Sequence, residues 1–391
     1  MKARKYEYYQ PPSRILMGPG PSMVDPRVNL AMASQAVGYM DPACFDILDD
    51  IMDLLRYTFQ TVNDFTLAVS GTGSAGMEAS VVNFVKPGTK VAILANGFFS
   101  DRLTEMCIRQ QAEVVRLEKP WGEVFNGDET VDFIRREEPH VVTHVQAETS
   151  TGAFQDSRPI CDAAHEVGAL VIGDCVTSLG GMPVQVDVNG IDITYSATQK
   201  CLGAPAGLSP ITLSPRAAEQ LKTRKSKSTG WYIDLKLLSG YWHPPRVYHH
   251  TAPISMLYAL REALRIVHEE TLEKRHARHR LNHLALVAGL ETMGLHMHVD
   301  PKHRLWTLNT VRLPEGVDDN ALRQALLNRY GIEILGGFGP LAGKILRVGL
   351  MGASSTRNNV LLFLDALESA MAQQGHTLGV GGTQAAERVY A

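Results

Sequence analysis

Seven short apolar runs, rich in Val, Ile and Leu, recur between Thr66 and Leu213 and alternate with amphipathic segments of helix length. Most of each run is continuously apolar, which is typical of strands that are buried on both faces. Such strands, separated by helical crossovers, predict an α/β fold whose large domain holds a mainly parallel seven-stranded sheet. The runs are TLAVSG, KVAILANG, AEVVRLEK, HVVTHVQAE, ALVIGDCV, DITYSAT and LSPITLS.

A different pattern follows the polar connection at 222–250. Apolar residues recur at spacings of three and four over 254–295, which predicts long helices that lead out of the sheet domain. The C-terminal part then reads as strand, helix, strand, strand and helix, so we expect a small α/β lobe. Its Gly-rich tail, from residue 375, is expected to be loosely held. The expected divisions are an N-terminal arm at 1–25, a large domain at 26–275 and a small C-terminal domain at 276–391.

Composition narrows the classes of partner. The chain has 391 residues, of which 45% are hydrophobic and 20% charged, and its formal net charge is −3. This charge gives no electrostatic footprint for nucleic acid or for an anionic membrane, so small polar or zwitterionic partners are favoured. No apolar run approaches the roughly 20 residues of a membrane span, and the N-terminus lacks the apolar stretch of a signal peptide.

The five cysteines fall in no C-x-x-C spacing, so neither a disulfide framework nor a metal site is expected. A reducing cytoplasm fits this cysteine usage.

The segment at 66–84 has the spacing of a phosphate-binding turn. Backbone N–H groups and the positive end of a helix dipole would bind a phosphate at the three glycines of GTGSAG, Gly71, Gly73 and Gly76. A dinucleotide site also needs an acidic residue at the end of the next strand, where this chain has Asn96. The hydroxyls of Thr72 and Ser74 suit a single terminal phosphate. The alternative is a tight turn capped by Ser74.

Two residues at strand ends carry candidate chemistry. Asp174 ends the apolar run ALVIGDCV, and Lys200 follows the next run in SATQK. Strand carboxyl ends are where open α/β sheets bind ligands. An amine that can form an imine, beside a carboxylate that can hold a protonated pyridine nitrogen, is what pyridoxal 5'-phosphate (PLP) chemistry requires. The alternatives are a capping aspartate and a solvated surface lysine.

Two more side chains have both a structural and a functional interpretation. Arg347, within the strand KILRVGL, is either a paired strand residue or a bidentate fork for a substrate carboxylate. Phe99, just past the ANGF turn, is either a core residue or an aromatic ring that stacks on the pyridine ring.

Together these stretches resemble the alanine–glyoxylate and serine–pyruvate aminotransferases of the class V, fold-type I PLP enzymes. The resemblance covers nearly the whole chain and implies an aminotransferase that moves an amino group from alanine or serine to glyoxylate or pyruvate. The motifs that carry it are LMGPGPS (16–22), SGTGS, ANGFF, ETSTG (148–152), GDCVTSLGG, SATQK, RVYHHTAPISMLYALREAL (246–264) and GFGPLAGKILRVGLMG (337–352).

The resemblance implies a role for each site residue. Lys200 would be the Schiff-base lysine, Asp174 would bind the pyridine nitrogen, and Phe99 would stack on the ring. The remaining cofactor residues of the same subunit would be Thr72, Gly73, Ser74, Thr149 and Gln199.

Two groups of residues would complete the site. In a homodimer with shared sites, Tyr248 and Thr251 would reach the phosphate from the other subunit. The substrate, a small amino acid or 2-oxo acid, would contact Gly20, Tyr39 and Arg347, with Arg347 on its carboxylate.

Related activities of the same family stay open as alternatives. Ureidoglycine–glyoxylate aminotransferases are similar in the helix 254–270, but have asparagine at the position of Tyr248 and glutamine near Tyr39. Pyridoxamine–pyruvate aminotransferases carry a glutamate at the position of Thr72, where a carboxylate would repel phosphate. Tyr39 and Tyr248 favour an alanine or serine donor, although Tyr39 is bulkier than the residue typical of alanine–glyoxylate enzymes.

Other classes of protein have less support. A cysteine desulfurase needs a nucleophilic cysteine in its C-terminal half, whereas the last cysteine here is Cys201. A nicotinamide-dependent oxidoreductase depends on GTGSAG alone, and a non-catalytic scaffold would leave Lys200 without a role.

Overall fold

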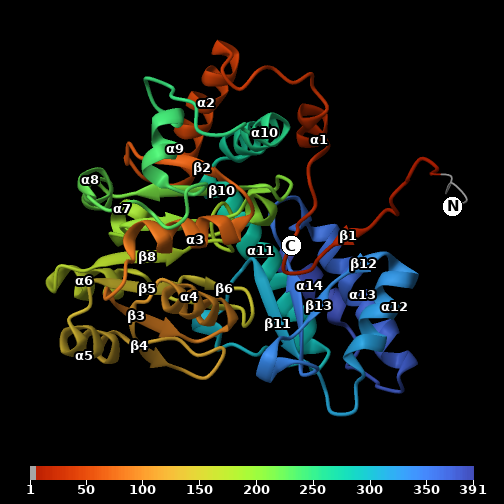
Figure 1. The fold of residues 1–391 in the computed structure, drawn as a ribbon. Helices are drawn as coiled ribbons and strands as arrows, with labels where there is room; N and C mark the ends of the chain where they lie inside the picture. Colours follow the sequence, from red (N-terminus) through yellow and green to blue (C-terminus); the bar gives the residue numbers. More distant parts are fainter. Residues whose placement is uncertain (1–5) are drawn as a thin grey trace, which may run out of the picture.

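A seven-stranded sheet forms the centre of the larger lobe in the computed structural model, which describes residues 6–391 (Figure 1). The strand order is β2-β10-β9-β8-β5-β3-β4; β10 runs antiparallel to both neighbours, and the other pairs are parallel. The predicted mainly parallel sheet is thus confirmed. Its strands are β2 (Thr66–Ser70), β3 (Lys90–Ala95), β4 (Glu113–Glu118), β5 (Val141–Val145), β8 (Leu170–Asp174), β9 (Ile193–Tyr195) and β10 (Leu208–Leu213).

Helices cover both faces of this sheet. Every residue of β2, β5, β8 and β10 is buried, which requires cover on both sides and explains the continuous apolar runs. The edge strand β4 instead exposes charged residues, which discourages pairing with another sheet. The helices of this lobe are α1 (Pro26–Met32), α2 (Pro42–Phe59), α3 (Gly73–Phe84), α4 (Phe98–Arg109), α5 (Gly127–Glu137), α6 (Arg158–Glu166), α7 (Val186–Asn189), α8 (Pro215–Thr223), α9 (Leu235–Trp242) and α10 (Ile254–Glu270).

The long helical region divides at one residue. Thr271, with φ of 68°, separates α10 from α11 (Leu272–Thr292), so the predicted long helices are present as two. α10 packs on α1 and α2, whereas α11 packs against the C-terminal helices. No helix in the described part of the chain is long and apolar enough to cross a membrane.

The smaller lobe has an antiparallel sheet of its own. Its strand order is β11-β14-β13, and Met17 of the N-terminal arm belongs to its apolar core. The arm also pairs with this lobe in parallel, strand β1 (Ile15–Leu16) against β12 (Ile332–Glu333). The expected domain boundaries at 25 and 275 stay predictions. The other elements are β11 (Leu308–Arg312), α12 (Asp319–Tyr330), β13 (Leu335–Gly336), β14 (Ile345–Gly349) and α13 (Arg357–Gln373).

The C-terminal tail is more ordered than its glycines predict. Residues 382–390 form helix α14 (Gly382–Tyr390), which packs on α11 and α13. A Cβ at Gly289 of α11 would lie 3.0 Å from the Gly382 carbonyl oxygen and 2.4 Å from Leu364, so the two helices approach closely. Ala386 is fully buried between them. The prediction of a loosely held tail was therefore wrong for α14, because small residues allow close helix packing.

Candidate active site

The predicted cofactor residues gather where the parallel strands end. β8 ends at Asp174, and the chain leaves the neighbouring strand β9 toward Lys200. Since parallel strands present their carboxyl ends at the same edge, side chains from distant segments meet there. Eight of the predicted residues line one cavity of about 180 Å³: Thr72, Gly73, Ser74, Phe99, Thr149, Asp174, Gln199 and Lys200.

Asp174 is a buried carboxylate held by two donors. One oxygen accepts the backbone N–H of Val176 at 2.9 Å, and the other accepts the hydroxyl of Tyr195 at 2.7 Å. Burial raises the pKa of Asp174 to about 6, while these hydrogen bonds and the Lys200 charge oppose the rise. The carboxylate is therefore fixed in orientation and is mostly ionised at neutral pH. The sequence interpretation missed Tyr195, although its strand pairs directly with Asp174.

Lys200 lies in a short π-type turn, η1 (Thr198–Leu202), where its own φ of −101° and ψ of −129° are non-helical. Lys200 as a whole residue is 9% exposed, and its amine donates to the carbonyl oxygen of Pro19 in the N-terminal arm. Gly20 has a φ of 114°, which favours glycine, and a Cβ there would lie 2.7 Å from Nζ, so the backbone lies directly against the amine. Burial lowers the pKa of Lys200 to about 8, which raises the fraction of neutral, nucleophilic amine.

A second arm residue fixes the backbone around the lysine. Ser22 donates its backbone N–H to Gln199 O at 2.9 Å and its hydroxyl to Lys200 O at 2.8 Å. These contacts join segments far apart in the chain, and the sequence interpretation missed them. The motif LMGPGPS was the signal, because it ends at this serine.

The start of α3 has the features of an anion cradle. Thr72, its N-cap, makes no side-chain capping bond within the described chain, so its hydroxyl does not occupy the N–H groups of Gly73 and Ser74, both of which line the cavity. A Cβ at Gly73 would lie 2.8 Å from Ala197, so the close approach requires glycine. The amide oxygen of Gln199 is buried with no hydrogen-bond partner in the described residues. The free backbone N–H groups and the glycine opening fit the phosphate of PLP, whereas the Gln199 oxygen is an acceptor and needs a donor as its partner.

Arg347 comes from the smaller lobe and is 1% exposed at the centre of β14. Its Nε donates to Gly336 O at 2.7 Å, Nη1 donates to Thr149 O at 3.4 Å, and the guanidinium lies 4.0 Å from the centroid of Phe338. In the part of the chain that the structure describes, it forms no ion pair. Burial lowers the pKa of Arg347 to about 10, so the group still carries its charge at neutral pH.

The loop that holds Thr149 contains a further buried acid. Glu148 accepts the backbone N–H of Phe99 at 3.2 Å and both the N–H and the hydroxyl of Ser150, at 3.0 and 2.6 Å. Burial raises the pKa of Glu148 to about 7. Through its hydrogen bonds to Phe99 and Ser150, Glu148 connects the segment that carries Phe99 to the loop beside Arg347. ETSTG was noted in the sequence, but no role was assigned to its glutamate.

Five predicted residues do not line this cavity: Gly20 and Arg347, described above, and Tyr39, Tyr248 and Thr251. The rings of Tyr39 and Tyr248 contact each other with centroids 5.2 Å apart, and neither ring lines the cavity. Tyr248 is 53% exposed, and Thr251 is also exposed. The single chain thus separates the last three residues from the eight that line the cavity.

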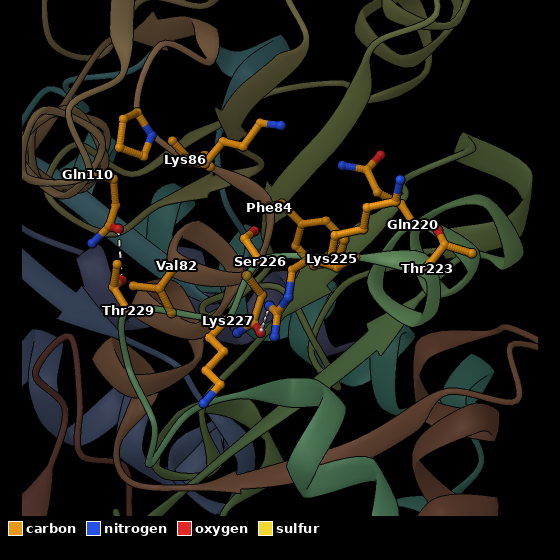
Figure 2. A pocket seen from close by; sticks show the side chains of 14 residues that line it. Val82, Phe84, Lys86, Gln110, Gln220, Thr223, Lys225, Ser226, Lys227 and Thr229 are labelled. Carbon is orange, nitrogen blue, oxygen red and sulfur yellow. Dashed lines mark hydrogen bonds between the residues drawn. The ribbon is translucent and has the colours of Figure 1, made fainter.

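A second hollow, of about 680 Å³, lies between the end of α3 and the loop after α8 (Figure 2). Thr229 Oγ1 donates to Gln110 Oε1 at 2.8 Å on its wall, and Lys86, Lys225 and Lys227 are exposed at its rim (Figure 2). It shares no lining residue with the cavity around Lys200. Because its lysines are solvated, no candidate chemistry is concentrated there.

The family follows from comparison with known proteins. The model of the class-V aminotransferases matches residues 36–363. The chain belongs to this family. It is 39% identical to the (S)-ureidoglycine–glyoxylate transaminase of Bacillus subtilis (strain 168), over 97% of this chain and 96% of that one. It is 38% identical to the alanine–glyoxylate aminotransferase of Callithrix jacchus, over 92% and 88%.

Solved structures agree with this assignment. The structure of alanine–glyoxylate aminotransferase from Nostoc sp. superposes with a TM-score of 0.93 at 47% identity, covering 94% of this chain and 98% of that one. The class-V aminotransferases and these structural neighbours depend on PLP, so the chain is a PLP-dependent transaminase with the fold-type I architecture. The predicted family, fold, enzyme class and cofactor are confirmed.

The first prediction concerns the amine. PLP added to the cofactor-free protein should become attached at Lys200, about tenfold faster at about pH 9 than at about pH 7, because the neutral amine fraction grows through a pKa of about 8. Borohydride reduction and peptide mapping at each pH measure the attachment. Label on another lysine, or a rate independent of pH, would contradict the assignment.

Asp174→Asn tests the carboxylate. The variant should keep its circular dichroism spectrum but lose transamination roughly 100- to 1,000-fold, because a neutral amide no longer favours a protonated pyridine nitrogen. Tyr195→Phe, which removes one donor to Asp174, should lose less. Near-normal turnover in Asp174→Asn would reduce this residue to a structural role.

Proposed function

We propose that the chain transfers an amino group from a small amino acid, alanine or serine, to glyoxylate or pyruvate. Relatives named alanine–glyoxylate aminotransferases support this choice. The reaction is proposed for the cytoplasm, since all five cysteines are buried free thiols, as a reducing compartment favours.

Each residue of the cavity has a proposed part in the chemistry. When bound, PLP supplies an electron-accepting ring that stabilises the charge left when a substrate Cα–H bond breaks. Asp174 holds a proton on the pyridine nitrogen, and Phe99 packs on the ring face. Lys200, the catalytic residue, would accept the proton from the substrate Cα and deliver it to the carbonyl carbon of the cofactor.

The phosphate is proposed to bind at the N-terminus of α3. The donors available to it are the N–H groups of Gly73 and Ser74, the hydroxyls of Thr72 and Ser74 and the side-chain NH2 group of Gln199. A dianion is favoured at this position because the helix dipole places partial positive charge there. Thr149 would lie beside the ring.

The observation that carries the substrate class is the environment of Arg347. Its guanidinium is 1% exposed, and its hydrogen-bond partners among residues 6–391 are the backbone carbonyls of Gly336 and Thr149, so donors stay free for a carboxylate. Amino acids and 2-oxo acids share such a carboxylate, so one arginine serves both halves of a transamination. The backbone of Gly20 against Lys200 limits the space near the amine, which favours donors with small side chains.

A panel of donors tests the substrates. Holoenzyme should give its highest kcat/KM with alanine or serine, against glyoxylate or pyruvate, and lower values with (S)-ureidoglycine and pyridoxamine. A preference for ureidoglycine or pyridoxamine would overturn the donor assignment.

A variant of Arg347 tests the carboxylate contact. Arg347→Lys should raise KM about tenfold or more for amino and oxo acids, because a point charge replaces a planar fork, while the cofactor spectrum stays unchanged. Arg329→Lys, at an exposed position, is the control.

We also propose that the active form is a homodimer with shared sites. Tyr248 and Thr251 carry hydroxyls that are exposed and lie outside the cavity of their own chain. Large apolar side chains nearby are exposed as well, with Trp231 at 60% and Val247 at 58%, which suits a surface covered by a second copy. In that dimer the two hydroxyls would reach the partner's phosphate.

Mixing two inactive chains tests the shared site. One chain carries Lys200→Ala, and the other carries Tyr248→Phe with Thr251→Ala. Their heterodimer holds one site with an intact lysine and intact partner hydroxyls, so activity should partly return. Tyr248→Phe keeps the ring that contacts Tyr39, so folding should persist. Heterodimers that form without activity would show that the segment serves its own subunit.

A further inference from the structure

Arg102 lies at the cavity without a part in the chemistry described above. It follows Phe99 by one helical turn on α4, which contacts α3 (Figure 1). Its Nη1 donates to Ser74 Oγ at 3.1 Å, and its guanidinium carbon lies 4.9 Å from the centroid of Phe99 and 5.2 Å from that of Phe98. Arg102 thus contacts both the residue at the α3 N-terminus and the ring at the strand end.

The hydrogen bond constrains the serine hydroxyl. A guanidinium only donates, so Ser74 Oγ must be the acceptor of this bond. The serine's own proton is then free to point elsewhere, and a hydroxyl so fixed offers a donor to an anion at the start of α3.

Arg102 forms no contact ion pair with a carboxylate in the described chain, whereas Arg109 on the same helix pairs with Glu105 at 2.8 Å. The charge of Arg102 still acts on the buried carboxylate of Asp174, whose pKa it helps to lower. Positive charge beside a helix N-terminus is favourable only when an anion joins it, because both repel cations and attract anions. The stacking on Phe98 and Phe99 keeps the guanidinium at this place.

We propose that Arg102 is a positioning residue for the cofactor phosphate: it acts through Ser74, whose hydroxyl it orients toward the phosphate, and adds positive charge beside the α3 N-terminus. This inference rests on the proposed role of Ser74 in phosphate binding. It assigns a specificity for the phosphorylated cofactor to a residue one turn beyond the ring-stacking Phe99.

The test compares PLP with pyridoxal, which has the same ring and aldehyde but no phosphate. Dissociation constants are measured by absorbance on the cofactor-free protein. Arg102→Met keeps an apolar stem against the rings but removes the charged donor. It should raise the dissociation constant for PLP about tenfold, because charge-assisted hydrogen bonds contribute more binding energy than neutral ones. Pyridoxal affinity should stay within about twofold. Arg102→Lys should lose less PLP affinity, because it keeps the charge.

A double-mutant cycle identifies the route through Ser74. In a Ser74→Ala background, Arg102→Met should cause a much smaller further loss of PLP affinity. Arg109→Met is the matched control on α4 and should change neither affinity.

The outcomes are distinct. An equal loss for PLP and pyridoxal would mean that Arg102 only packs the ring, and additive losses would mean that it acts independently of Ser74. No loss would mean a solvated side chain, and each of these results overturns the proposal. If the unaltered protein binds PLP and pyridoxal equally well, the proposed phosphate site itself fails, which separates that failure from the failure of Arg102.

Discussion

Exclusion of water from the amine of Lys200 is the constraint on which the rest of the site depends. An ammonium group loses much of its hydration when buried, so the neutral form is favoured, and the pKa of Lys200 falls to about 8. The positive charge of Arg347 acts in the same direction, while Asp174 opposes it. The cover over the amine is backbone from the N-terminal arm, at Pro19 and Gly20. That arm is anchored away from the site, by the pairing of β1 with β12 and by Met17 in the core of the smaller lobe.

The two lobes meet at the loop beside Arg347, the residue proposed to bind the substrate carboxylate. Arg347 belongs to β14 of the smaller lobe, yet its guanidinium reaches the carbonyl of Thr149 in the larger one. Thr310, which pairs with Arg347 across the sheet, donates its hydroxyl to Thr151 O at 2.7 Å. A Cβ at Gly152, where φ is 80°, would lie 2.9 Å from the Thr310 hydroxyl, so the loop needs glycine to come this close. The position of the guanidinium relative to Lys200 is therefore set by packing between lobes.

Much of this arrangement could be predicted from the sequence, because parallel strands bring their carboxyl ends together. Asp174 and Lys200 were found from apolar runs that stop at polar residues, and the structure places both on one cavity. Contacts made by backbone carbonyls could not be found this way. Pro19 O lies 181 residues from its lysine in sequence and has no side-chain signal. The tail helix was missed for a similar reason. Gly382 allows close packing on α11, but in a single sequence a glycine required for packing cannot be distinguished from a glycine in a loop.

The same burial that tunes the lysine also tunes the acids around it. The pKa values of Asp174 and Glu148 rise to about 6 and about 7, and for both groups burial is the largest cause. Acid and amine pKa values thus move toward each other and toward neutrality, which is what proton exchange near neutral pH requires. Because the backbone of the arm covers the amine at Pro19 and Gly20, displacement of the arm would return the pKa of Lys200 to a higher value. The sequence supplies the amine of Lys200 and the carboxyl groups of Asp174 and Glu148, but burial by the surrounding residues sets the pKa of each group. A substitution in the arm can therefore impair chemistry without touching any group that reacts.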